Sequence, residues 1–97
     1  MVKHIVAFKL KGSPEERLSL SRKFKEALLA LPEKIDVLQS MEVGINENEG
    51  EDWDLVLTAI VPAMNDVAVY AKHPAHVEAA SIIADAKVSR ACVDYIV

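Results

Sequence analysis

The first eleven residues alternate between two rows of side chains, and this pattern limits the folds open to the whole chain. A period of two is typical of a β-strand that turns one face toward a core. One row is apolar apart from a single histidine: Val2, His4, Val6, Phe8 and Leu10. We therefore predict a strand over 2–11, which Gly12 ends.

A helix signal follows this strand directly. Ser13-Pro14-Glu15-Glu16 supplies a serine N-cap, a proline at the first helical position and a glutamate three residues after the cap. Apolar residues then recur at roughly helical spacing: Leu18, Phe24, Ala27, Leu28 and Leu31. We predict an amphipathic helix over 14–30, and Pro32 ends it or starts a short extra turn through Ile35.

The remaining chain predicts three further strands and a broken second helix. The strands are expected over 37–46, 53–61 and 88–97, and the helical pieces from Asn65 or Asp66 to Lys72 and from Pro74 to about Ala86. The resulting order is strand-helix-strand-strand-helix-strand, the split βαβ pattern of ferredoxin-like folds. We predict one α+β domain over 1–97 with a four-stranded antiparallel sheet.

The apolar content predicts a second copy of the chain as partner. Hydrophobic residues make up 52% of only 97 residues. A single small core is not expected to bury that many. Helices on one side of the sheet would leave a bare face that carries Ile5, Ala7 and parts of the other three strands, too apolar for water. We expect a homodimer in which two sheets pack face to face.

Charge and composition exclude several classes of partner. A formal net charge of −4 argues against nucleic acid. No apolar run approaches the roughly 20 residues that span a bilayer, and the N-terminus has no continuous apolar signal segment. With one cysteine the chain forms no internal disulfide, so we expect a cytoplasmic protein and a buried, unreactive Cys92.

The segment Tyr70-Ala71-Lys72-His73-Pro74-Ala75-His76 gathers the polar rings that suggest chemistry. A histidine can accept a proton from a C–H beside a carbonyl near neutral pH, and a tyrosine hydroxyl can donate to the enolate oxygen that forms. We predict His76 as general base and Tyr70 as oxyanion donor, with His4 lining the same cavity.

Two alternatives stand beside this interpretation. His73 and His76 can instead bond to backbone groups and hold the helix break, while His4 serves as a satisfied core histidine. His73 and His76 can also share a metal ion, but no third ligand is evident nearby. We therefore predict no metal site and no cofactor.

Five segments together resemble the stress-responsive α/β-barrel domain family of the dimeric α/β-barrel superfamily. They are Val2-Lys3-His4-Ile5-Val6, Val43-Gly44, Trp53-Asp54-Leu55-Val56-Leu57, Tyr70-x-x-His73-Pro74-Ala75-His76 and Val93-Asp94-Tyr95. The resemblance covers nearly the whole chain. It implies a homodimeric α/β barrel with a small-molecule pocket between the sheet and the helices of each subunit.

The family includes a plant relative, olivetolic acid cyclase, which closes a ring by aldol condensation without a cofactor. The resemblance implies that Tyr70 and His76 match its catalytic pair and that His4 and Phe24 match pocket residues; His73 joins the predicted ligand-binding set. Two pocket positions differ, since Leu55 stands where the cyclase has histidine and Ala27 where it has tyrosine. These departures argue against the same substrate.

Two functions from different classes follow. The first is binding of a small carbonyl or phenolic ligand with cofactor-independent acid–base chemistry; the alternative is a non-enzymatic stress or structural protein stabilised by dimerisation. Cofactor-free oxygenation of an aromatic substrate occurs in the superfamily, but no residue argues for it. An enclosed cavity that touches His4, Tyr70 and His76 would favour the first function, and side chains that fill that space would favour the alternative.

Overall fold

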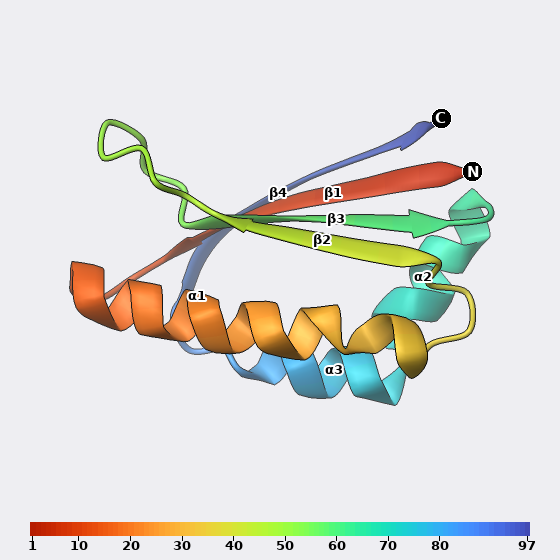
Figure 1. Cartoon of the computed structure of the whole chain (residues 1–97), viewed down its shortest axis with the longest axis horizontal. Helices are drawn as coiled ribbons and strands as arrows, with labels where there is room; N and C mark the ends of the chain where they lie inside the picture. The colour runs from red at the N-terminus through yellow and green to blue at the C-terminus, as the bar shows by residue number, and fades with distance from the viewer.

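The computed structural model describes residues 1–97 and shows one antiparallel sheet with all helices on one side (Figure 1). The strands are β1 (Val2–Leu10), β2 (Ser40–Ile45), β3 (Leu55–Val61) and β4 (Lys87–Ile96). The helices are α1 (Pro14–Leu29), the short 3₁₀ helix η1 (Leu31–Glu33), α2 (Met64–Lys72) and α3 (Pro74–Ser81). The predicted α+β, ferredoxin-like order of elements is confirmed. None of these helices combines the length and the apolar character that a membrane span requires.

The order of strands in the sheet is β2-β3-β1-β4, so β1 is central and β4 is an edge strand. Both partners of β1 run antiparallel to it. In the β1–β4 ladder, His4 stands opposite Asp94, and Val6 stands opposite Cys92. This register brings the two ends of the chain together, as the neighbouring termini in Figure 1 show.

The start of α1 follows the predicted capping pattern. The Ser13 hydroxyl accepts a hydrogen bond from the Glu16 backbone N–H at 3.1 Å, and the Glu16 carboxylate accepts one from the Ser13 N–H at 3.0 Å. Gly12 ends β1 with a φ of 121°, which an L side chain rarely adopts. The chain therefore turns sharply from strand to helix at the position where the sequence predicts it.

The buried face of α1 differs from the predicted one. Ser21, Phe24 and Leu28 are buried, whereas Leu18 is 39% exposed. The prediction that Leu18 belongs to the core-facing row is wrong, because the helix places the small Ser21 against the sheet. This side of α1 packs against β2.

Several predicted boundaries are also wrong. β2 begins at Ser40 rather than Val37, because Leu31, Ile35 and Leu38 are buried through η1 and the turns that follow it. β3 begins at Leu55 rather than Trp53, since the Asp54 backbone N–H bonds to the carbonyl of Phe8 before the ladder with β1 begins.

The second helical region is shorter than predicted. α2 starts at Met64, and the Asp66 carboxylate accepts from the Ala63 backbone N–H, so Asp66 caps the helix from its third position. α3 ends at Ser81 rather than near Ala86. Beyond it the backbone bonds to residues three positions earlier, the pattern of tight turns. β4 then runs from 87 to 96, one residue earlier at each end than predicted.

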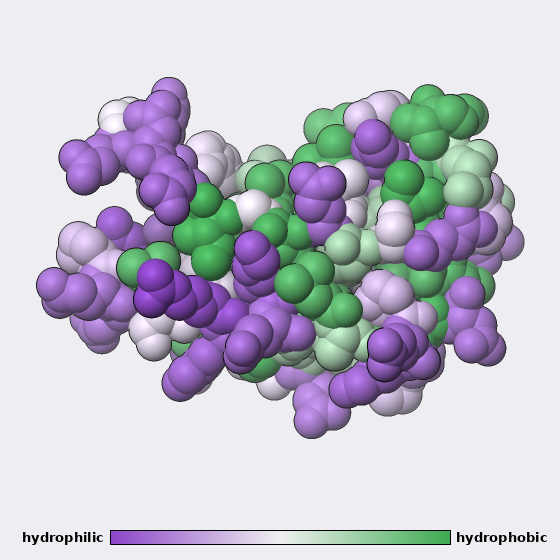
Figure 2. Space-filling model, viewed as in Figure 1, coloured by the Kyte–Doolittle hydropathy of each residue, from purple (hydrophilic) through white to green (hydrophobic).

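The core lies between the helices and one face of the sheet, and the other face has no cover within the subunit (Figure 1). On that open face Val56 is 38% exposed, Val93 62% and Tyr95 42%. Figure 2 shows hydrophobic surface gathered over the end of the sheet where the two termini lie. Cys92, predicted to be buried, is exposed in the subunit, because β4 is the edge strand.

Asp54 joins three segments at the other end of β1. Its carboxylate accepts hydrogen bonds from the Leu10 backbone N–H at 2.7 Å and from the Arg17 side chain at 3.1 Å. Arg17 also donates to the carbonyl of Gly12 at 2.7 Å. One carboxylate therefore links β1, α1 and the start of β3.

Replacing Asp54 with asparagine is expected to lower the free energy of unfolding by about 1.5–3 kcal/mol, the usual range for hydrogen bonds to a charged group. Urea unfolding followed by circular dichroism measures the change. Asp52→Asn is the matched control, because Asp52 is 81% exposed and lies 3.6 Å from Lys9. An exposed ion pair contributes little, so equal losses in both variants would contradict the linking role of Asp54.

Candidate active site

Three polar rings from three elements meet between the sheet and the α2–α3 break. The ring centroids of Tyr70 on α2 and His76 on α3 lie 4.5 Å apart. Those of Tyr70 and His4 on β1 lie 5.8 Å apart in an edge-to-face arrangement. We call His4, Tyr70 and His76 the ring cluster. Convergence of these rings, expected from sequence, is present in the fold.

Tyr70 forms the buried centre of this cluster. The residue is 1% exposed, and its hydroxyl has no hydrogen-bond partner. Burial raises the pKa of Tyr70 far above its usual value of 10, and Arg90 offsets this only in part. The phenol therefore stays protonated at every physiological pH and is available as a hydrogen-bond donor.

His76 is held in one tautomer by the carbonyl of Ala71. The two atoms, Nδ1 and the carbonyl oxygen, are 2.9 Å apart. A carbonyl only accepts, so Nδ1 carries the proton and Nε2 keeps its lone pair. Burial lowers the pKa of His76 below 6.5 against the opposing effect of the Ala71 bond, and His4 and Arg90 lower it further. At neutral pH this imidazole is therefore a neutral base.

His4 is oriented by Asp94, a residue to which sequence reasoning assigned no role. The His4 Nδ1 and an Asp94 carboxylate oxygen are 2.5 Å apart, and His4 is 5% exposed. Asp94 stands directly opposite His4 in the β1–β4 ladder. A carboxylate that accepts from Nδ1 leaves Nε2 of His4 free to meet a ligand. The alternation of β4 was visible in the sequence, but its register against β1 was not.

Cys92 lies next to His4 and Asp94, but its sulfur is not positioned as a catalytic nucleophile would be. Its sulfur lies 3.6 Å from the His4 Nδ1, the same nitrogen that Asp94 engages. A catalytic triad needs the nucleophile and the carboxylate on opposite ring nitrogens. Burial and Asp94 raise the pKa of the Cys92 thiol, so the thiol form persists at neutral pH.

His4, Cys92 and Asp94 are also the group whose atoms come nearest to a metal-binding set, within 4.8 Å of one another. Around a tetrahedral zinc ion, ligand atoms stand about 3.3–3.6 Å apart. The His4 Nδ1 and the Asp94 oxygen are instead in direct hydrogen-bond contact, closer to each other than two ligands of one zinc ion. The geometry therefore describes a hydrogen-bonded dyad.

The other predicted site residues lie outside the ring cluster. His73 is the N-cap of α3, where its Nδ1 accepts from the Ala75 backbone N–H at 3.0 Å. The Nδ1 atoms of His73 and His76 thus both bond to backbone groups, as one sequence alternative expected. Phe24 is 1% exposed and packs edge-to-face against Phe8, with ring centroids 5.4 Å apart. Its aromatic partner is a core residue and not one of the three rings.

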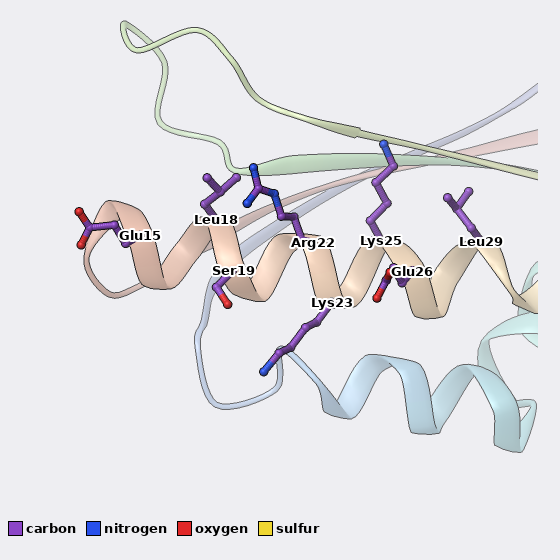
Figure 3. Close-up of a pocket in the computed structure, with 8 residues that line it drawn as sticks. All are labelled: Glu15, Leu18, Ser19, Arg22, Lys23, Lys25, Glu26 and Leu29. Atoms are coloured by element: carbon purple, nitrogen blue, oxygen red, sulfur yellow. The ribbon is translucent and has the colours of Figure 1, made fainter.

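Three surface hollows lie away from the ring cluster, and none of them touches its residues, so none of the three is the enclosed cavity that would favour the ligand-binding function. One runs along α1, where Leu18, Arg22, Lys25 and Leu29 stand in a row on the upper side of the helix (Figure 3). The others lie on the open sheet face beside Trp53 and near the loop between β2 and β3.

Replacing Tyr70 with phenylalanine tests whether the buried hydroxyl is unpaired. We expect the variant to be more stable by about 1 kcal/mol, because an unsatisfied buried polar group costs about 1–3 kcal/mol. For a chain of this size that corresponds to a rise of about 4–8 °C in the melting temperature. Differential scanning calorimetry of the two proteins without added ligand measures the change in melting temperature. A variant less stable than the natural chain would mean that water or another group already satisfies the hydroxyl.

Comparison with known proteins identifies a matching family and similar solved structures. The family model described as "Stress responsive A/B Barrel Domain" matches residues 2–97. A dimeric protein of unknown function with a ferredoxin-like fold from Bacteroides fragilis is 51% identical, with a TM-score of 0.93 over 97% of this chain and 93% of that one. No curated protein matches the chain.

Two more distant solved structures share the fold. A protein from Arabidopsis thaliana is 26% identical, with a TM-score of 0.72 over 99% of this chain and 94% of that one. A dimeric ferredoxin-like protein of unknown function from Thermobifida fusca is 24% identical, with a TM-score of 0.79 over 99% of this chain and 90% of that one.

Proposed function

This chain belongs to the stress-responsive A/B barrel domain family, and from that premise we propose that it is a homodimer that binds a small carbonyl or phenolic ligand at the ring cluster and acts on it by cofactor-independent acid–base chemistry. One observation carries the proposal. A buried tyrosine hydroxyl without a partner lies beside an imidazole whose tautomer leaves Nε2 unprotonated. A donor and a base side by side are the two groups that enolisation needs.

The proposed step is removal of a proton from a carbon next to a carbonyl. The C–H bond breaks as an N–H bond forms at Nε2 of His76, and the electron pair moves into the carbonyl to make an enolate. The Tyr70 hydroxyl donates to that enolate oxygen, where negative charge develops. His4, oriented by Asp94, supplies a second imidazole edge in contact with Tyr70.

The open sheet face supports the dimer. Exposed apolar residues of β3 and β4 share this face, and the hydrophobic surface of Figure 2 continues to the ends of β1 and β4. A relative that is 51% identical is described as dimeric. Two such faces packed together would cover an area that water solvates poorly.

A second candidate function has support of its own. His73 and His76 both bond to backbone groups at the α2–α3 break, and Tyr70 is almost fully buried. In a non-enzymatic stress or structural protein these rings would serve the fold alone. That function requires no ligand at the ring cluster.

Two measurements separate the candidates. Resorcinol, a small phenol, is titrated into ¹⁵N-labelled protein. If the ring cluster binds phenols, the amide resonances of Ala71, Val77 and the strand residues beside His4 are expected to shift. Acetylacetone, a diketone with acidic C–H bonds, is then followed in D₂O, where deuterium uptake above the buffer rate is expected. No shift with resorcinol, together with exchange at the buffer rate, would favour the non-enzymatic function.

A further inference from the structure

Arg90 lies on the helix-facing side of β4, the same side as Asp94, which bonds to His4. In the β1–β4 ladder it is opposite Phe8, two residues from Cys92 and four from Asp94. Alternate residues of a strand share a face, so these three side chains emerge on the same side as the buried row of β1. Arg90 is exposed, and the open sheet face, which we assign to the partner subunit, is the opposite one. The guanidinium therefore stays accessible in the proposed dimer.

The charge of Arg90 has no carboxylate partner in the subunit. The ion pairs join His4 to Asp94, Lys9 to Asp52 and Arg17 to Asp54. The acid on the same face of β4 is thus already engaged by a histidine. Arg90 lowers the pKa of Tyr70, of His76 and of Cys92, so its field reaches all three groups around the site.

We propose that Arg90 selects ligands that carry a carboxylate, which it holds from the exposed edge strand β4 while the Tyr70 hydroxyl donates to a second oxygen of the ligand. The inference rests on the proposed ligand site and adds its substrate class. A planar guanidinium matches a carboxylate with two parallel hydrogen bonds, a match that a neutral amide lacks. The unpartnered Tyr70 hydroxyl supplies the independent sign that a polar ligand group belongs here.

The test compares 4-hydroxybenzoate with 4-hydroxybenzamide, which have the same ring and hydroxyl and differ in charge. Dissociation constants are measured by NMR titration of the full chain, of Arg90→Gln and of Lys87→Gln. Lys87 is the other cation of β4 and serves as the control for overall charge. We expect the natural chain and Lys87→Gln to bind the acid about 10- to 100-fold more tightly than the amide, as for a hydrogen bond between charged groups. In Arg90→Gln the two ligands should bind about equally.

The outcomes separate this inference from the proposed function. Two outcomes would overturn the role of Arg90 and leave the ligand site standing. One is equal binding of acid and amide by the natural chain, and the other is a preference for the acid that persists in Arg90→Gln. Binding of neither ligand would overturn both. Amide spectra recorded for each variant without ligand verify that the fold is retained.

Discussion

Replacing His76 with asparagine is expected to slow deuterium uptake by acetylacetone by about 10²–10⁴-fold, the usual contribution of a general base. Asparagine can still donate a hydrogen bond to the Ala71 carbonyl, as Nδ1 of His76 does. It has no equivalent of the unprotonated Nε2, so the variant removes the base and keeps the link across the α2–α3 break. The rate is measured by proton NMR in D₂O at fixed protein concentration.

The pH dependence provides a second check on the same base. His76 must be neutral to accept a proton, so the rate should rise with pH and level off. Burial lowers the pKa of His76, which places the midpoint below 6.5. Tyr70 stays protonated because burial raises its pKa, so the plateau should continue through pH 9. Val77→Ala, an exposed neighbour on α3, should behave as the natural chain; an unchanged rate in His76→Asn would exclude His76 as the base.

Replacing Val93 with glutamate is expected to weaken the dimer by about 10³-fold or more. Val93 is 62% exposed in the subunit, on the open face of the edge strand. In a face-to-face dimer each copy would bury an unpaired carboxylate, which costs about 3–5 kcal/mol per charge. Sedimentation equilibrium at micromolar concentration should then show the mass of one subunit in place of two.

The control for this variant places the same charge elsewhere. Leu29 is 46% exposed on α1, on the side of the sheet that the helices cover. Leu29→Glu should remain dimeric, since the proposed contact does not include α1. If Val93→Glu sediments as a dimer, or if the natural chain is monomeric, the open face is not the contact between subunits.

Local patterns predicted the elements of this fold well because their causes are local. The alternation from Val2 to Leu10 and the capping box of Ser13 and Glu16 depend on neighbours within a few residues. The predicted boundaries were wrong where a contact with a residue distant in the sequence sets the end or the buried face of an element. β3 starts late beside Asp54, whose side chain bonds to β1 and α1, and Leu18 is exposed because the helix packs through Ser21.

The candidate site shows the same division. Tyr70 and His76 were found because both lie in one seven-residue segment around a proline, and His4 because it interrupts an apolar row. Asp94 and Arg90 received no role, although both lie in a strand whose alternation was recognised. The role of each side chain depends on which residue of β1 stands opposite it. A shift of the β1–β4 register by one residue would turn both side chains to the other face of the sheet.

By itself the sequence determined the strand and helix order, the caps and the excess of apolar residues, because periodicity, capping and composition act over short distances. Only the tertiary structure decided that Asp94 orients His4, that the Tyr70 hydroxyl is left without a partner, and that Arg90 shares a face of β4 with Asp94 without a carboxylate partner. These facts follow from pairing between residues up to 90 positions apart, which depends on how the whole sheet assembles and leaves no local trace.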